Sequence, residues 1–352
     1  MFLLAHVSSL LCLAFLQAEA AASPTLTGGW TTSGPVLYQV NSVATGPQDH
    51  ASVYAAASIY DVKQSALFRS PDGGKTWNTL VEASGGEFYS EIAVDPRDPR
   101  RLYAGAAGNS GTASIYRSID GGETWSKRSS VSPSCAPSFA PGSSRDTVLL
   151  SCGKKVLRSQ DAGATWTELT SPFTEPTRLA AGSSGTLLAY GATGIFRSTD
   201  DGGTWVSIAS PPPACSRILA LRVDPGNAQV FVAGTGKLGS GGFECGGVFR
   251  STDSGKTWGN NALAGVYVTD VVIDPLSPST LYASASYLSG ILPKGGAFRS
   301  QDAGGTWTDL RVPALGAVRL ALSPSGSQLH AATPIGVFDL GFRRTRLVPT
   351  RE

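Results

Sequence analysis

Ser70-Pro71-Asp72-Gly73-Gly74-Lys75-Thr76-Trp77 is the stretch that decides the fold of this chain. The pattern Ser-x-Asp-x-Gly-x-Thr-Trp, called the box below, occurs six times, and its aspartates are Asp72, Asp120, Asp161, Asp200, Asp253 and Asp302. Successive aspartates lie 48, 41, 39, 53 and 49 residues apart. A period of this size is typical of solenoids, propellers and repeat arrays.

Each box predicts a β-hairpin. An apolar pair followed by Arg-Ser, as in residues 67–70, is typical of the end of a strand. The Asp-x-Gly segment turns the chain, because Asp accepts hydrogen bonds from nearby amides and Gly tolerates positive φ. Thr-Trp then begins the next strand, with the indole as a packing surface. We interpret the six aspartates as structural, because six identical active sites in one chain are far less plausible.

The six boxes resemble the Asp-box repeat of bacterial neuraminidases and cover almost all of the chain after residue 25. The resemblance implies a β-propeller. The family includes sialidases, xyloglucanase-type glucanases, sortilin-type receptors and photosystem II assembly-factor propellers. In size and repeat number the chain is more similar to the single-propeller assembly factors than to the hydrolases. A shared fold does not settle function.

A second pattern precedes each box and sets the number of blades. Val-Asp-Pro-type segments such as residues 92–96 are followed by Leu-Tyr-Ala-type segments such as residues 102–104, so each unit supplies four strands, A to D. Seven units are present, and the last has no box. Trp30 matches the missing box Trp. The sequence therefore predicts an all-β, seven-bladed propeller of four-stranded antiparallel blades, with residues 25–32 completing the last blade.

The ends of the chain predict export and a single domain. Residues 1–20 contain an apolar run and a small-x-small cleavage site at 18–20, which predicts a signal peptide and a secreted or periplasmic protein. The alternative, a membrane anchor, is disfavoured because the run is too short to span a bilayer. We expect one propeller over residues 21–342, a basic tail over 343–352, no membrane insertion and a monomer.

Cysteine content and charge limit the disulfides, ligands and cofactors that we expect in this protein. Four cysteines follow the signal segment, and proximity favours the disulfides Cys135–Cys152 and Cys215–Cys245. The formal net charge of +2 gives no reason to expect nucleic acid binding. No His, Cys and Asp cluster has metal-ligand spacing, and no phosphate-binding loop is present, so we expect neither metal nor cofactor. His330 replaces a strand-B tyrosine and is expected in the core.

Long B–C connections, over residues 58–66, 106–114, 235–246 and 286–296, predict that one face of the ring carries function. The start of strand A aligns Ser42, Glu91, Arg178, Ala220, Asp270 and Arg319 near the channel mouth on this face. One interpretation is a structural ion pair between Asp270 and Arg319. The other is a ligand site formed by Glu91, Arg178, Asp270 and Arg319.

Two classes of function remain open. We favour a binding scaffold that presents the loop face and channel mouth to a protein or carbohydrate ligand. The alternative is a glycoside hydrolase, with Glu91, Asp270 and Asp61 as weak catalytic candidates. Sialidase activity is disfavoured, because no arginine lies between residue 23 and Phe68 and the family's Phe-Arg-Ile-Pro-like motif is absent. Xyloglucanase-type enzymes use two tandem propellers, and this sequence has the length of one.

Overall fold

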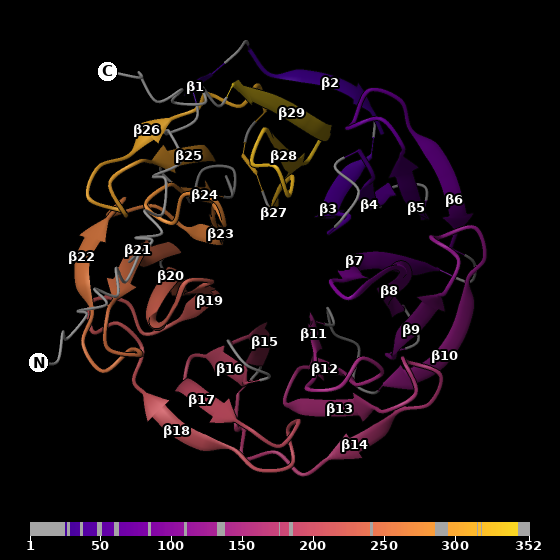
Figure 1. The fold of residues 1–352 in the computed structure, drawn as a ribbon, viewed down its shortest axis with the longest axis horizontal. Coiled ribbons are helices and arrows are strands. Elements are labelled where there is room, and N and C mark those ends of the chain that lie inside the picture. The colour runs from indigo at the N-terminus through magenta and orange to yellow at the C-terminus, as the bar shows by residue number, and fades with distance from the viewer. Residues whose placement is uncertain are drawn as a thin grey trace, which may run out of the picture.

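The computed structural model describes residues 25–343, apart from 27–28, 36–37, 48–50, 60–62, 84–85, 109–110, 132–137, 176, 183–185, 240–241, 286–294, 315 and 318. Seven sheets stand around a central axis as the blades of a propeller (Figure 1). Every regular element in the described part is a strand, so the predicted all-β, seven-bladed architecture is confirmed. No helix in those ranges is long and apolar enough to cross a membrane.

Six blades each contain four antiparallel strands in chain order, from strand A at the channel to strand D at the rim (Figure 1). Blade 1 contains β3 (Gln39–Thr45), β4 (Val53–Ile59), β5 (Gln64–Ser70) and β6 (Asn78–Glu82); blade 2 contains β7 (Glu87–Asp95), β8 (Asp98–Gly108), β9 (Ala113–Ser118) and β10 (Ser126–Val131). Blade 3 contains β11 (Ser138–Pro141), β12 (Val148–Cys152), β13 (Lys155–Ser159) and β14 (Thr167–Leu169); blade 4 contains β15 (Thr177–Ala181), β16 (Leu187–Gly191), β17 (Gly194–Ser198) and β18 (Val206–Ala209). Blade 5 contains β19 (Ile218–Asp224), β20 (Asn227–Gly239), β21 (Gly242–Ser251) and β22 (Gly259–Ala262); blade 6 contains β23 (Val268–Ile273), β24 (Leu281–Ala285), β25 (Gly296–Ser300) and β26 (Thr308–Asp309).

Blade 7 closes the ring with strands from both ends of the propeller. Its inner strands are β27 (Arg319–Leu322), β28 (Gln328–Thr333) and β29 (Gly336–Arg343), and β1 (Thr25–Leu26) and β2 (Thr31–Gly34) both pair with β29. The indole N–H of Trp30 donates to the carbonyl of Leu310 at 2.7 Å, and its ring packs against the cluster that joins blades 6 and 7. The predicted closure is confirmed.

The hydrophobic core lies between neighbouring blades. The cluster at the closure joins Val40 and Phe68 of blade 1 to Ala332 and Val337 of blade 7. Strand B of blade 1 contributes three consecutive buried alanines, at positions 55, 56 and 57, whose small side chains let adjacent sheets approach closely. Each buried Val or Phe contributes about 1.5–3 kcal/mol relative to leaving it exposed. His330 is fully buried in strand B of blade 7, as predicted.

The six boxes form the same hydrogen-bonded turn. In blade 3, Ser159 Oγ donates to Asp161 at 2.7 Å and accepts from the amide of Gly163, while Asp161 accepts from the amide and the hydroxyl of Thr165 at 2.8 and 2.6 Å. These bonds lower the pKa of the aspartates in blades 1, 2, 4, 5 and 6 to about 2, and outweigh burial in lowering that of Asp161 to the same value. The two residues after each box aspartate have positive φ, including the non-glycine Ala162 and Ala303. Every box therefore serves as a turn.

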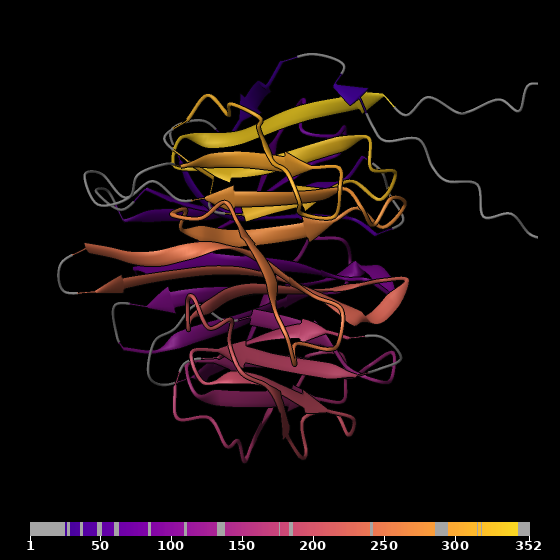
Figure 2. The same ribbon diagram turned by 90° about the vertical axis from the view of Figure 1, so that its left-hand side faces the viewer.

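The two faces of the ring differ. The A–B turns and the boxes lie on one face, called the box face, and the B–C and D–A connections lie on the opposite loop face. In blade 5 the long B–C connection expected as a loop is instead a hairpin extension of β20 and β21, which projects beyond the neighbouring blades (Figure 2). The disulfide Cys215–Cys245 ties it to the preceding D–A connection, as predicted. Cys135 lies outside the described residues, so its pairing with Cys152 stays a prediction.

Candidate functional site

The channel is the place where the predicted site residues meet. A cavity of about 350 Å³ is lined by all six positions of the strand-A register, Ser42, Glu91, Arg178, Ala220, Asp270 and Arg319, together with residues that include Tyr190 and Arg222. Arg178, Asp270 and Arg319 are each among the first three residues of their strands, so they lie toward the end where the D–A connections enter. The sequence register thus identifies one physical surface.

Asp270 pairs with Arg222, and the predicted ion pair with Arg319 is wrong. Arg222 Nη2 donates to Asp270 Oδ1 at 2.8 Å. The same carboxylate accepts from its neighbouring amide, Val271 N, at 3.0 Å and from the amide of Leu320 in blade 7 at 3.2 Å. Arg222 lies on strand A of the neighbouring blade 5, two residues after the register position Ala220, and its side chain reaches Asp270. Asp270 therefore joins three consecutive blades.

Arg319 instead points to the other acid. Its Nη2 lies 3.9 Å from Glu91 Oε2, and its Nη1 donates to the carbonyl of Thr269 at 3.0 Å. The hydroxyl of Ser42 donates to Glu91 Oε1 at 3.4 Å. Burial raises the pKa of Glu91, although the guanidinium groups of Arg319 and Arg178 act in the opposite direction. Glu91 is thus a partly buried carboxyl with long, weak contacts.

Arg178 is the exception among the charged groups of the channel. Within the described part of the chain it makes no hydrogen bond or ion pair. The neighbouring guanidinium of Arg319, followed by burial, lowers the pKa of Arg178. For Arg222, burial works against the charge, but the carboxylate of Asp270 keeps its pKa above the ordinary value. Three arginines face two acids, so the cavity has an excess of positive charge and a guanidinium with free donors.

The two acids do not form an acid/base pair. The carboxylate of Asp270 already accepts three hydrogen bonds, from Arg222, Val271 and Leu320, so its oxygens are engaged in holding the blades together. Glu91 is the better candidate for a proton donor, because burial raises its pKa. Asp61, the third catalytic candidate, lies outside the described residues. No group of three His, Cys, Asp or Glu side chains in the described ranges could hold a metal ion.

Sequence reasoning missed Arg222 and Tyr190. Arg222 aligns with Ala93 of blade 2 and Val272 of blade 6, at a strand position that is apolar in those blades. A single arginine at an otherwise apolar strand position was a usable signal, because a buried charge requires a partner. Tyr190 lies on strand B of blade 4, three per cent exposed, and gave no comparable signal.

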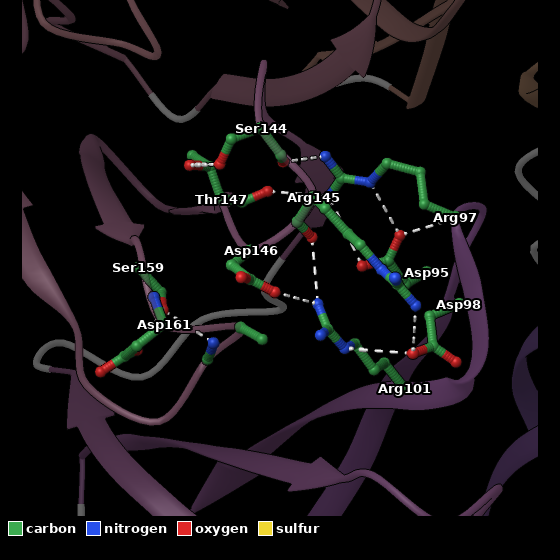
Figure 3. Close-up of polar contacts among 12 residues, drawn as sticks. Asp95, Arg97, Asp98, Arg101, Ser144, Arg145, Asp146, Thr147, Ser159 and Asp161 are labelled. Carbon is green, nitrogen blue, oxygen red and sulfur yellow. Dashed lines mark hydrogen bonds and ion pairs between the residues drawn. The ribbon is translucent and has the colours of Figure 1, made fainter.

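A second charged cluster lies on the box face, where the A–B turns of blades 2 and 3 meet (Figure 3). The guanidinium of Arg97 pairs with Asp95 at 3.0 Å and donates to three carbonyls of the 142–147 turn, those of Gly142, Ser144 and Thr147. Arg101 and Arg145 add ion pairs to Asp98 at 3.4 and 3.2 Å, and Arg101 also reaches Asp146. Every charge in it has a partner, so this cluster is a clasp between blades.

Comparisons of the sequence with known proteins give short matches to one family model and to several xyloglucanases. A family model described as sortilin, neurotensin receptor 3 (Sortilin-Vps10), matches residues 65–171. The xyloglucanase Xgh74A of Acetivibrio thermocellus is 34% identical over 85 residues, which are 21% of this chain and 10% of that protein. A xyloglucanase of Hypocrea jecorina is 34% identical over 94 residues, 24% of this chain and 11% of that protein. The matches span about a tenth of the length of these relatives.

Solved structures extend the likeness to nearly the whole chain. The GH74 xyloglucanase from Xanthomonas campestris has a TM-score of 0.67 at 19% identity, and the alignment covers 88% of this chain and 52% of that one. YCF48 from Cyanidioschyzon merolae has a TM-score of 0.62 at 15% identity, with 89% and 98% covered. A structure of YCF48 bound to D1 peptide has a TM-score of 0.59 at 16% identity, with 90% and 98% covered. At these identities the likeness shows the propeller fold, which occurs in both hydrolases and binding scaffolds.

Proposed function

We propose that this chain is an Asp-box binding scaffold whose channel mouth accepts an acidic group of a protein partner. The observation that carries the proposal is Arg178, a guanidinium in the channel cavity with no acceptor in the described part of the chain. A carboxylate would supply that acceptor in a bidentate geometry and relieve the repulsion between Arg178 and Arg319. The hairpin of β20 and β21 projects from the loop face, the face on which the mouth lies (Figure 2).

Two further observations support an exported, peptide-binding protein. The disulfide Cys215–Cys245 suits an oxidising compartment, in keeping with a secreted or periplasmic protein and a signal peptide over residues 1–20. A single-propeller relative in fold, YCF48, has been solved with a bound peptide. The partner of this chain is proposed on the chemistry of the channel alone, and the scaffold is proposed to act as a monomer.

The experiment is a peptide array in which each sequence is present once with Asp or Glu and once with Asn or Gln. Wild-type protein should prefer the acidic members, and Arg178→Gln should lower the affinity for them at least tenfold. Arg311→Gln is the matched control, because Arg311 lies in an exposed D–A connection of the same face. Equal binding of acidic and amide peptides by the wild-type protein would contradict the proposal.

A glycoside hydrolase is the second candidate, favoured by the 34% identity with a xyloglucanase over 85 residues and by the raised pKa of Glu91. Asp270 counts against a hydrolase, because its carboxylate is already hydrogen-bonded to Arg222, Val271 and Leu320. Xyloglucan, other polysaccharides and chromogenic glycosides test it directly. We expect no turnover; turnover that disappears in Glu91→Ala while the variant stays folded would replace the scaffold proposal.

A further inference from the structure

Neighbouring blades are bridged on the box face by a recurring hydrogen bond. Tyr54 of blade 1 donates its hydroxyl to the carbonyl of Gly121 in the box of blade 2, at 3.4 Å. Tyr103 of blade 2 donates to the carbonyl of Ala162 in the box of blade 3, at 3.1 Å. Between blades 3 and 4, Arg158 Nη1 donates to the carbonyl of Asp201 at 3.4 Å. In each case the acceptor is the residue directly after the box aspartate.

The junctions between blades 4 and 5 and between blades 5 and 6 are without this bridge in the described part of the chain. In blade 5, Val232 occupies the position of Tyr54 and Tyr103, since each is the cross-strand partner of the box arginine. Leu188 occupies the same position in blade 4. Neither side chain can donate a hydrogen bond. The side chains of the box arginines beside them, Arg250 and Arg197, make no hydrogen bond or ion pair with any described residue.

Cavities lie at these same two junctions. The one between blades 5 and 6 has a volume of about 390 Å³ and lies against Arg250 and the box of blade 6; the one between blades 4 and 5 has about 260 Å³ and lies against Arg197. Packing around the box glycines separates the two junctions: a Cβ on Gly255, between blades 4 and 5, would lie 2.8 Å from Ala209, so only the junction between blades 5 and 6 has room. A Cβ on Gly163 would lie 2.6 Å from the ring of Tyr103, whereas a Cβ on Gly304 would find its nearest atom, in Leu281, at 3.5 Å. Between blades 5 and 6 the missing tyrosine leaves open space.

The lining of the larger cavity specifies a ligand. Arg250 supplies unpaired side-chain donors, the carboxylate of Asp302 supplies negative charge, and Val248 and Leu281 supply an apolar floor. A simple anion would be repelled by the carboxylate of Asp302, and a simple cation would be repelled by the guanidinium of Arg250. A hydroxyl group both donates and accepts, so it satisfies the guanidinium and the box oxygens together. A ring that carries several hydroxyls and one C–H face is a pyranose.

We propose that the junction between blades 5 and 6 is a saccharide-binding site that takes one pyranose unit of a neutral glycan. The volume of this cavity is in the range of small-ligand pockets. The site is on the box face and shares no lining residue with the channel cavity, so it does not depend on the function proposed above.

The test is saturation-transfer difference NMR of the whole protein with methyl glycosides of gluco, galacto, manno, xylo and fuco configuration. At least one should receive saturation from the wild-type protein. The variant Val232→Tyr introduces the tyrosine that blades 1 and 2 have at this position, and it should abolish transfer while keeping or raising Tm. No transfer to any glycoside, or undiminished transfer in the folded variant, would overturn the proposal.

A second set of variants guards against misfolding of the tyrosine variant. Arg250→Gln should weaken glycoside binding at least fivefold, because it removes the charged donor. Arg158→Gln is the matched control, since Arg158 has the same position in blade 3 but already bridges to Asp201, and its binding should equal that of the wild type. Sodium sulfate that displaces the glycoside and binds more tightly would show an oxyanion site and overturn the saccharide assignment. Acidic peptides should bind the channel equally well in all these variants.

Discussion

Arg222 in blade 5 and Asp270 in blade 6 share a charged hydrogen bond of 2.8 Å in the wall of the channel. The side chain of Asp270 is three per cent exposed, whereas that of Arg222 is 39% exposed, so the pair is buried on its acidic side and open on its basic side. Such an arrangement fixes the carboxylate and leaves the guanidinium partly available to solvent or a ligand.

Asp270→Ala should destabilise the propeller, because the amides of Val271 and Leu320 lose their acceptor and Arg222 loses its partner. We expect a cost of about 1–3 kcal/mol in the free energy of unfolding, measured in urea. Asp270→Asn keeps one side-chain acceptor and should cost less. Equal stability of Asp270→Ala and the wild type would show that the pair does not hold the blades together.

Asp161→Asn should cost little, because the amide oxygen can still accept from Thr165, while Asp161→Ala should cost about 1–3 kcal/mol by leaving those donors unpaired. Trp166→Ala should cost about 3–5 kcal/mol, because a packed aromatic ring is removed. Peptide binding at the channel should survive in every variant that stays folded. Loss of that binding without loss of stability would move the functional face to the box side.

Arg97→Ala tests the clasp between blades 2 and 3. Three carbonyls of the 142–147 turn lose their donor, so we expect a cost of about 2–3 kcal/mol in thermal or urea unfolding. Arg100→Ala is the matched control, because the side chain of Arg100 is 73% exposed and its ion pair with Asp98 is long, at 3.5 Å. An exposed pair of this kind contributes about 0–1 kcal/mol. Similar costs for the two variants would contradict the clasp.

Trp30→Ala should destabilise strongly, by about 3–5 kcal/mol, because the indole packs against the cluster between blades 6 and 7. Trp30→Phe keeps much of the ring and removes the hydrogen bond to Leu310, for about 1 kcal/mol. Deletion of residues 21–32 should lower Tm at least as far as Trp30→Ala. An unchanged melting temperature after the deletion would show that closure of the ring needs no N-terminal strand.

The pH dependence of stability should reflect the boxes. Their aspartates have a pKa of about 2 in the folded protein, against an ordinary value of 3.8, so the unfolded chain binds more protons between these values. Their contribution is therefore fully present above about pH 4 and is lost as the pH falls toward 2. Thermal melts over this range should show the loss, and Asp161→Asn should make it less steep. A flat Tm down to pH 2 would contradict the assignment.

Much of this molecule could be predicted from its sequence, because the box repeats and each copy carries its own local hydrogen bonds. Trp30 was recognisable as a displaced box Trp, so the closure was predictable too. The channel register was also predictable, since strands A are aligned by their turns. The partner of Asp270 was not, because Arg222 and Arg319 flank it in adjacent blades and only side-chain reach decides between them.

The cavities between blades lay beyond that reasoning for a different reason. Val232 and Leu188 are ordinary strand residues when each is considered alone. They become informative only beside Tyr54, Tyr103 and the box of the next blade, which is a contact between blades rather than a pattern along the chain. An alignment of the repeats shows which positions carry a smaller residue than their equivalents, and these positions are where space between the blades is expected.

The pairing of β2 with β29 has a consequence for the order in which the protein is made. β2 leaves the ribosome before any blade exists, and its partner is translated some 300 residues later, as the 308-residue separation between Thr31 and Asp339 shows. Until then β29 is missing, and β2 has no native edge to join. Blades can pack on one another during synthesis, but the ring can close only after the seventh has emerged. The ring closes in a single late, long-range step, and such steps are slow. Nascent chains stalled before β29 should thus remain open rings with an exposed sheet edge, vulnerable to proteases and to pairing with one another.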